Sequence, residues 1–139
     1  KAGGVVPLLR PTIDTVAPTT RPAEVDSFTS DPGLLYVRAA LGPASSFTVY
    51  DGTKISARLD AAKPELSVTP GTLFTQGAMV EIIGAPRPAG VAIAGSPALV
   101  QSSTTALLGQ MSGWAFTDTA GGTVWVKLGS GEQTLSITP

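Results

Sequence analysis

The chain has 139 residues, of which 42% are hydrophobic and 14% are charged, with nine basic residues against ten acidic ones. This length fits one domain or two very small ones, and it is too short for a catalytic barrel of roughly 250 residues. The net charge of -1 provides no positive field, so neither nucleic acid nor an anionic membrane is an expected partner. The hydrophobic fraction is sufficient to bury a core.

The chain contains neither cysteine nor histidine. The usual zinc ligand sets, a Ser-His-Asp triad, a cysteine nucleophile and an imidazole acid or base are therefore excluded. We expect no metal and no cofactor, and any remaining chemistry would use carboxylates, hydroxyls, lysine or arginine. The lack of cysteine leaves the localisation open, because cytoplasmic and exported bacterial domains both occur without disulfides.

Sixteen glycines and twelve prolines interrupt the chain, which leaves only short segments between turn signals. Such segments at this spacing predict an all-β fold, an antiparallel β-sandwich of Greek-key or meander type with little or no helix. Residues 104–111 are the one stretch with helical spacing, and Gly109 weakens it. Strands are expected at residues 5–9, 34–41, 47–50, 54–59, 66–69, 79–83, 91–94, 114–117, 123–128 and 134–138.

Residues 11–33 carry four prolines and read as irregular chain. A loop of this length is uncommon inside a compact domain, so we expect it to lie against another surface. In the hairpin that follows, a two-residue turn at 51–52 would place Phe47 on the opposite face from Ile55. A loop longer by one residue, a bulge, or a sheet covered on both sides would resolve this conflict.

The last strands alternate most clearly. Val124, Val126 and Leu128 share one face of their strand, and the next strand has its own apolar face. Because residues 129–132 are turn formers, they predict a hairpin between the last two strands. Residues 118–122 in turn predict a hairpin between strands 114–117 and 123–128. Together the three strands are expected to form a meander at the C-terminus.

Several segments resemble family 31 glycoside hydrolases, the α-glucosidase and α-xylosidase group. The opening KAGGVVPLL is similar to the VRAGxIIPL stretch that follows the catalytic barrel in that family, with Lys1 in place of arginine. Residues 35–38 and the later SFTVYDG are similar to an extended strand and an FTLYEDDG turn, with the acidic turn shortened. The segments similar in order and character to the distal C-terminal sandwich are residues 79–86, 91–95, 113–116 and 123–128.

The resemblance implies that the chain is one part of a larger enzyme, a retaining α-glycosidase. Residues 1–60 would form the end of a proximal sandwich and residues 61–139 a distal one, both buttressing the catalytic barrel. The family's nucleophile and acid/base are two aspartates on that barrel, and nothing here matches their motifs. We therefore expect no catalytic residue. The expected partners are the barrel or, through uncovered strand edges, a second copy of the chain.

A carbohydrate is the third candidate partner. Trp125 is expected on the polar side of its strand beside Thr123 and Lys127, and an aromatic face flanked by hydrogen-bond donors suits a pyranose ring. Tyr36 is a candidate second platform. The competing interpretation is that Trp125 contacts another domain. Trp114, on the preceding strand, is expected in the core together with Phe116.

The carboxylates give no strong sign of catalysis. Asp51 and Asp60 are close in sequence, but both fall in turn contexts, where solvated or turn-capping acids are ordinary. The same holds for the spacing of Glu24 and Asp26. Asp26 and Asp31 do not form the alternating acidic pattern that calcium prefers.

Glu81 is unusual because apolar residues flank it on both sides in a predicted strand. It is expected on a solvated face, or otherwise paired with Arg38 or Arg58. Three functions thus stay open at this point. They are a non-catalytic sandwich that buttresses an α-glycosidase barrel, a free-standing carbohydrate-binding sandwich, and a structural or adhesive surface module.

Overall fold

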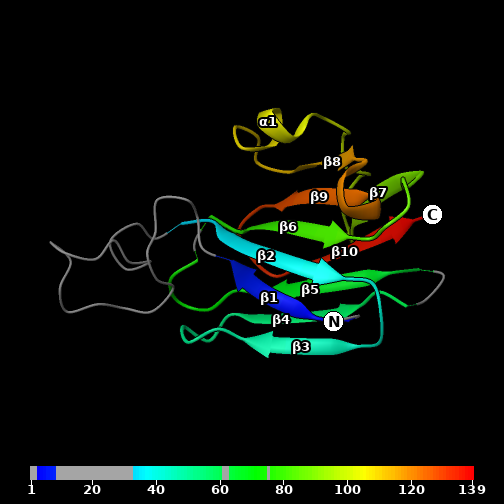
Figure 1. Cartoon of the computed structure of the whole chain (residues 1–139). Helices are drawn as coiled ribbons and strands as arrows, with labels where there is room; N and C mark the ends of the chain where they lie inside the picture. The colour runs from blue at the N-terminus through cyan, green and yellow to red at the C-terminus, as the bar shows by residue number, and fades with distance from the viewer. Residues whose placement is uncertain (1–2, 9–32, 61–62, 75) are drawn as a thin grey trace, which may run out of the picture.

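A computed structural model describes residues 3–8, 33–60, 63–74 and 76–139. These residues form a β-sandwich of two five-stranded sheets with one short α-helix (Figure 1). We call the sheets sheet I and sheet II. In spatial order, sheet I contains β1 (Val5–Leu8), β2 (Leu35–Ala40), β6 (Ala78–Ile83), β9 (Thr123–Leu128) and β8 (Gly113–Thr117). Sheet II contains β3 (Ser45–Thr48), β4 (Lys54–Arg58), β5 (Glu65–Thr69), β10 (Gln133–Thr138) and β7 (Gly90–Ile93).

The predicted all-β sandwich is confirmed, and each predicted strand segment overlaps an observed strand, although most boundaries differ by one or two residues. Residues 104–111 contain α1 (Thr104–Leu107), a single helical turn whose N-cap is Ser103. The Ser103 hydroxyl accepts a hydrogen bond from the backbone N–H of Ala106 at 3.2 Å, which satisfies one of the free donors at the helix start. A 3₁₀ turn, η1 (Thr119–Gly121), connects β8 to β9. The expectation of an irregular segment at 11–33 falls almost wholly outside the described residues.

The core lies between the two sheets and follows the alternation of the strands. In β9, Val124, Val126 and Leu128 are at most 1% exposed, and in β10 the inward side chains are Leu135 and Ile137. The main core cluster also contains Trp114 of β8, as predicted, with Phe116 packed against it. This alternation places one face of every strand pair in the common core, where burial of apolar area stabilises the sandwich.

The loop between β3 and β4 has one residue more than a two-residue turn, which is one of the predicted solutions. The register pairs Phe47 with Ile55, and the N–H of Val49 donates to the carbonyl of Thr53 at 2.8 Å. Residues 50–52 form the loop, with Gly52 at a φ of 90°, the left-handed region that glycine adopts at little cost. Phe47 and Ile55 therefore share a face, although Phe47, on the outermost strand of sheet II, is 40% exposed.

The predicted C-terminal meander is wrong in its second half. β8 and β9 pair antiparallel as expected, but β10 pairs with β5 and β7 in the opposite sheet. Residues 129–132 therefore cross from one sheet to the other instead of closing a hairpin. The crossing lets Leu128 and Leu135 both reach the core between the sheets, and local turn chemistry does not distinguish it from a hairpin.

One pairing departs from a simple antiparallel arrangement. β2 and β6 pair in parallel, with Val37 opposite Val80. In each sheet a strand from before residue 60 pairs with a strand from after it. These pairs are β2–β6 in sheet I and β4–β5 in sheet II. Among the described residues, segments 1–60 and 61–139 do not form separate sheets, and their assignment to proximal and distal sandwiches of a larger enzyme stays a prediction.

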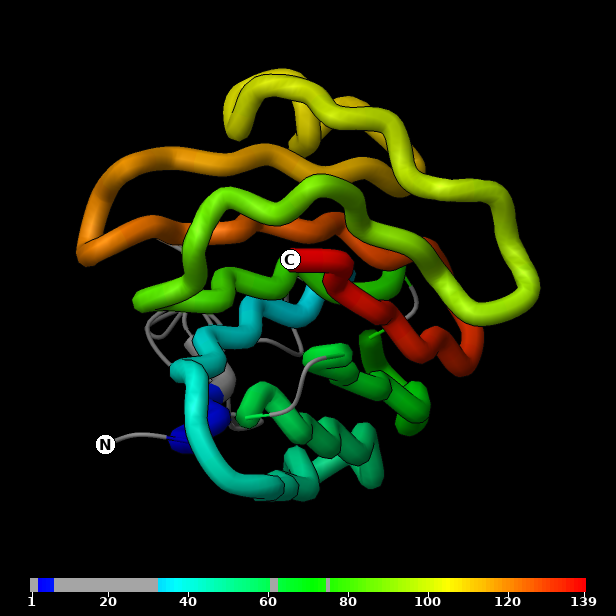
Figure 2. The backbone as a smooth tube through the Cα atoms, turned by 90° about the vertical axis from the view of Figure 1, so that its right-hand side faces the viewer, coloured from blue at the N-terminus to red at the C-terminus, as the bar shows by residue number. Residues whose placement is uncertain are grey.

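One side of the sandwich is closed by the chain itself. Residues 98–102 run from the edge of β7 to the edge of β8, where the N–H of Leu99 donates to Val91 and the N–H of Ser102 donates to Trp114. This segment is the yellow-green tube that rises toward α1 in Figure 2. Because these bonds occupy backbone groups at both edges, β7 and β8 offer fewer free groups for pairing with another chain.

Candidate functional site

The outer face of β9 carries three of the four predicted carbohydrate-binding residues, and each already has a partner. The indole Nε1 of Trp125 donates to Thr117 Oγ1 at 3.3 Å. Thr123 is only 1% exposed, and its hydroxyl donates to the carbonyl of Thr119 at 2.9 Å. The Nζ of Lys127 donates to the carbonyl of Leu108 at 2.7 Å. Thr123 is thus too buried to meet a ligand, while Trp125 and Lys127 remain half-buried.

Tyr36, the fourth predicted residue, lies on the same outer face of sheet I. The register places it in one row with Met79 and Lys127, two strands away from the latter. Tyr36 and Trp125 both pack against a second apolar cluster on the outer face of this sheet. This outer cluster consists of Leu34, Met79, Leu107 and Ala115. The two aromatic side chains therefore share a face and take part in packing, and a carbohydrate-binding role for them stays a prediction.

Glu81 also lies on this outer face, in the row that runs from Arg38 to Trp125. It is 8% exposed, and one carboxylate oxygen accepts a hydrogen bond from Nε of Arg38. The first expectation, a solvated Glu81, is wrong, and the alternative of pairing with Arg38 is correct. Because Glu81 is buried, its carboxylate needs the nearby guanidinium to offset its desolvation.

Asp51 has a turn-capping role, as expected for an acid in this context. Its carboxylate accepts hydrogen bonds from the N–H of Thr53 at 3.0 Å, the hydroxyl of Thr53 at 2.8 Å and the N–H of Leu73 at 3.1 Å. The Thr53 hydroxyl in turn accepts from the N–H of Gly71 at 2.9 Å. This network joins the β3–β4 loop to the segment after β5.

Tyr50 lies beside this network, and its phenol has a pKa above the ordinary value. Partial burial raises the pKa of the Tyr50 phenol, and the negative charge of Asp51 raises it further. Both causes disfavour the phenolate. The residue is nevertheless 44% exposed.

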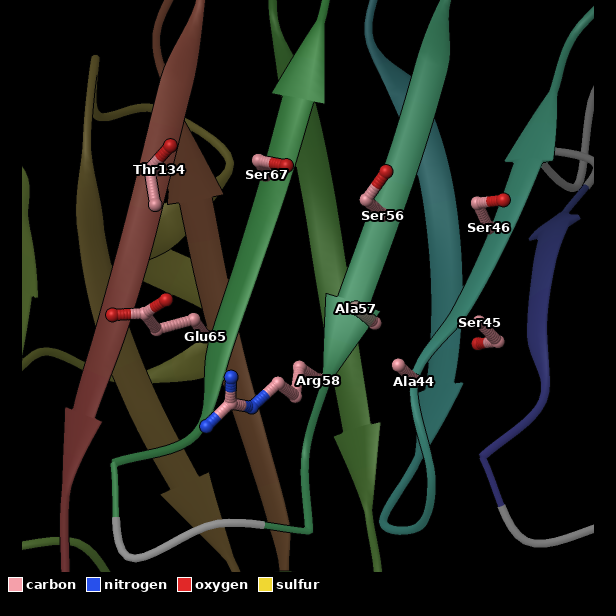
Figure 3. A pocket seen from close by; sticks show the side chains of 9 residues that line it. All are labelled: Ala44, Ser45, Ser46, Ser56, Ala57, Arg58, Glu65, Ser67 and Thr134. Atoms are coloured by element: carbon pink, nitrogen blue, oxygen red, sulfur yellow. The ribbon is translucent and has the colours of Figure 1, made fainter.

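The outer face of sheet II contains a trough of about 580 Å³ (Figure 3). Hydroxyl side chains form one row across four neighbouring strands, because the register pairs Ser46 with Ser56, Ser56 with Ser67, and Ser67 with Thr134. Three intervals between strands make this row about 14 Å long. Figure 3 shows the four hydroxyl-bearing side chains next to one another on β3, β4, β5 and β10.

A charged pair lies beside the hydroxyl row. Arg58 and Glu65 are cross-strand neighbours on β4 and β5, and both are exposed in the trough. Within the described part of the chain, neither forms an ion pair with the other or with a third residue. The four hydroxyls of the row likewise form no hydrogen bonds with described side chains. The trough therefore presents donors and acceptors whose bonding capacity is available to solvent or a ligand.

Sequence reasoning did not single out this trough. The signal was a Ser or Thr at an outward position of four strands, but only the observed register shows that these positions meet. Of the considered acids, Glu24, Asp26 and Asp31 lie outside the described residues. The described residues contain no group of three or more carboxylates able to hold a metal ion. They also contain no helix of the length and hydrophobicity that a membrane span requires.

No protein-family model and no curated protein matches the chain by sequence. Solved structures do match it. The cycloalternan-forming enzyme from Listeria monocytogenes, solved with a pentasaccharide substrate, is 16% identical with a TM-score of 0.70, covering 99% of this chain and 13% of that one. The family 31 dextranase of Flavobacterium johnsoniae, solved with glucose, is 12% identical with a TM-score of 0.67, covering 100% of this chain and 19% of that one.

A third match is the α-1,4-glucan lyase of Gracilariopsis lemaneiformis, at 17% identity and a TM-score of 0.59, with 99% of this chain and 16% of that one covered. At these identities the likeness concerns the fold. The chain spans only 13 to 19% of the length of these three enzymes. In structure, the chain therefore corresponds over nearly its whole length to one small part of family 31 carbohydrate-active enzymes.

Proposed function

We propose that this chain is a non-catalytic β-sandwich of a larger α-glycosidase-like protein, in which it packs against a catalytic barrel and stabilises it. One observation carries the proposal. Nearly all of the chain matches a small part of each of three carbohydrate-active enzymes, while 81% or more of each matched enzyme lies outside the match. A sandwich that occurs in enzymes acting on different glucans is better suited to supporting a catalytic domain than to carrying out one particular reaction.

Exposed apolar side chains around α1 support a contact with another part of such a protein. Val100 is 74% exposed, Leu108 56% and Met111 86%, and all three lie between residues 100 and 111. Helix α1, which lies within this segment, is at the top of Figure 1. Exposed apolar groups that cluster in one segment are typical of interaction surfaces. Backbone groups at the edges of β7 and β8 on this side are already hydrogen-bonded. A contact with another domain would therefore form by side-chain packing rather than by strand pairing.

Substitution of Met111 by aspartate tests this proposal in two settings. In the isolated chain Met111 contacts little, so we expect the change to leave the melting temperature nearly unaltered. In the natural full-length protein the charge would lie in an apolar contact, and the melting temperature should fall by several degrees. Ser96→Asp is the matched control, because Ser96 is exposed but polar.

Two results would contradict the proposal. One is hydrolysis of nitrophenyl α-glucoside by the purified 139-residue chain, at a rate that persists through repeated purification. The other is a full-length protein that keeps its melting temperature and activity after the whole sandwich is deleted.

A further inference from the structure

We propose that the trough on the outer face of sheet II binds a neutral oligosaccharide. The ligand class follows from the lining, and only the choice of α-glucans as first probes rests on the proposed function. The trough is separate from the face that carries Trp125 and Tyr36, since those residues lie on the outer face of the other sheet. It is therefore a different surface from the one that the sequence suggested.

The charges of the trough favour a neutral ligand. Arg58 provides a positive group that donates hydrogen bonds, and Glu65 provides a negative group that accepts them, on adjacent strands. An anion bound there would face the carboxylate and a cation would face the guanidinium. A ligand with many hydroxyls meets no such penalty, because a hydroxyl both donates and accepts.

The spacing of the row favours a chain of repeating units. Neighbouring strands lie about 4.8 Å apart, and this spacing of the hydroxyl-bearing positions is close to the length of one pyranose ring. Ser46, Ser56, Ser67 and Thr134 thus offer one hydroxyl contact per sugar along a bound oligosaccharide. The lining contains no aromatic ring, so hydrogen bonds rather than stacking hold the ligand, and we expect a dissociation constant in the millimolar range.

The test uses the ¹⁵N-labelled 139-residue chain, titrated with maltoheptaose and isomaltoheptaose and followed by amide chemical shifts. We expect saturable shifts on β3, β4, β5 and β10, centred on the hydroxyl row. The double variant Ser56→Ala/Ser67→Ala should weaken binding about tenfold, because it removes two hydrogen-bonding groups. Thr69→Ala is the matched control, since Thr69 is on the same strand and face as Ser67 but outside the trough.

Cellohexaose serves as a third probe and separates the two proposals. Binding of cellohexaose alone, with the same footprint on sheet II, would support the trough and count against an α-glycosidase-like parent. No shift change with any of the three sugars would overturn the trough proposal, while the Met111 experiment on the full-length protein would be unaffected. Shifts centred on Trp125 and Tyr36, or equal loss in the double variant and in Thr69→Ala, would also overturn it.

Discussion

The two sheets share one core, yet their outer faces differ. On sheet I the outer cluster, with Leu107 of α1, covers part of the outer face, and Met79 is only 4% exposed. On sheet II the corresponding positions carry hydroxyls and charges that face solvent, among them Ser56 and Arg58. Sheet I is thus a middle layer over part of its area, whereas sheet II is a boundary between core and water.

The strand sequences reflect this difference. β6 reads AMVEII, and five of its six residues are buried, as expected for a strand with cover on both faces. β4 reads KISAR and alternates strictly between exposed and buried residues. The outer face of sheet I is buried against α1 at its β8–β9 end, whereas the outer face of sheet II is exposed to solvent and open to a ligand. The comparison can be tested by changes on each face.

The largest effect is expected from a pair of truncations on the two outer faces. Met79→Ala removes a buried side chain from the outer cluster and should lower the free energy of unfolding by about 3 kcal/mol. Ser67→Ala, on the outer face of sheet II, should change it by less than about 0.5 kcal/mol. Urea unfolding followed by tryptophan fluorescence measures both. Similar losses in the two variants would mean that the faces do not differ in the way described.

The next largest effect is expected in the β3–β4 loop, at one end of sheet II. Asp51→Ala removes the acceptor of three hydrogen bonds and leaves the N–H of Leu73 without its partner, so we expect a loss of about 2 kcal/mol. Asp118→Ala is the control, because the Asp118 side chain makes no capping bond at η1. A loss confined to the control, measured in the same urea experiment, would refute this role for Asp51.

A smaller effect is expected at the ion pair on sheet I. Arg38→Gln leaves Glu81 charged and mostly buried, but the Arg38 side chain is 48% exposed, so solvent moderates the loss to about 1 kcal/mol. Adding Glu81→Gln should restore part of the stability, because the uncompensated charge is then removed. A double-mutant cycle of urea unfolding measures the coupling. Strict additivity of the two substitutions would show that the pair contributes no coupling.

The smallest effect is a change of stability with pH, and it is expected at Tyr50 in the β3–β4 loop of sheet II. Because its pKa is raised in the folded chain, Tyr50 holds its proton more tightly there than in the unfolded chain. Its contribution to stability is complete below the unfolded pKa and is lost as the pH rises through the folded pKa. The stability advantage of wild type over Tyr50→Phe should therefore shrink from about pH 9 to about pH 11. An advantage that grows over this range would contradict the direction.

Part of the candidate sites was accessible from the sequence. Alternation placed Trp125 and Lys127 on the outward side of β9, and the pairing of Glu81 with Arg38 was one of two expectations. The burial of Thr123 was not foreseen, because it depends on a bond to the carbonyl of Thr119 in the adjacent turn. The trough was missed because the four residues of its hydroxyl row lie on four different strands, and Ser46 and Thr134 are 88 positions apart.

The local sequence pattern predicted where the strands lie and which face of most strands turns toward the core, because alternation with a period of two is a local property of the chain. Tertiary structure decided which strands pair, and this put β10 in the sheet opposite β9 although their connection has the composition of a hairpin turn. It also decided which outer face is covered. Both outcomes depend on burying apolar area between segments distant in the sequence, and no local pattern specifies which distant segments meet.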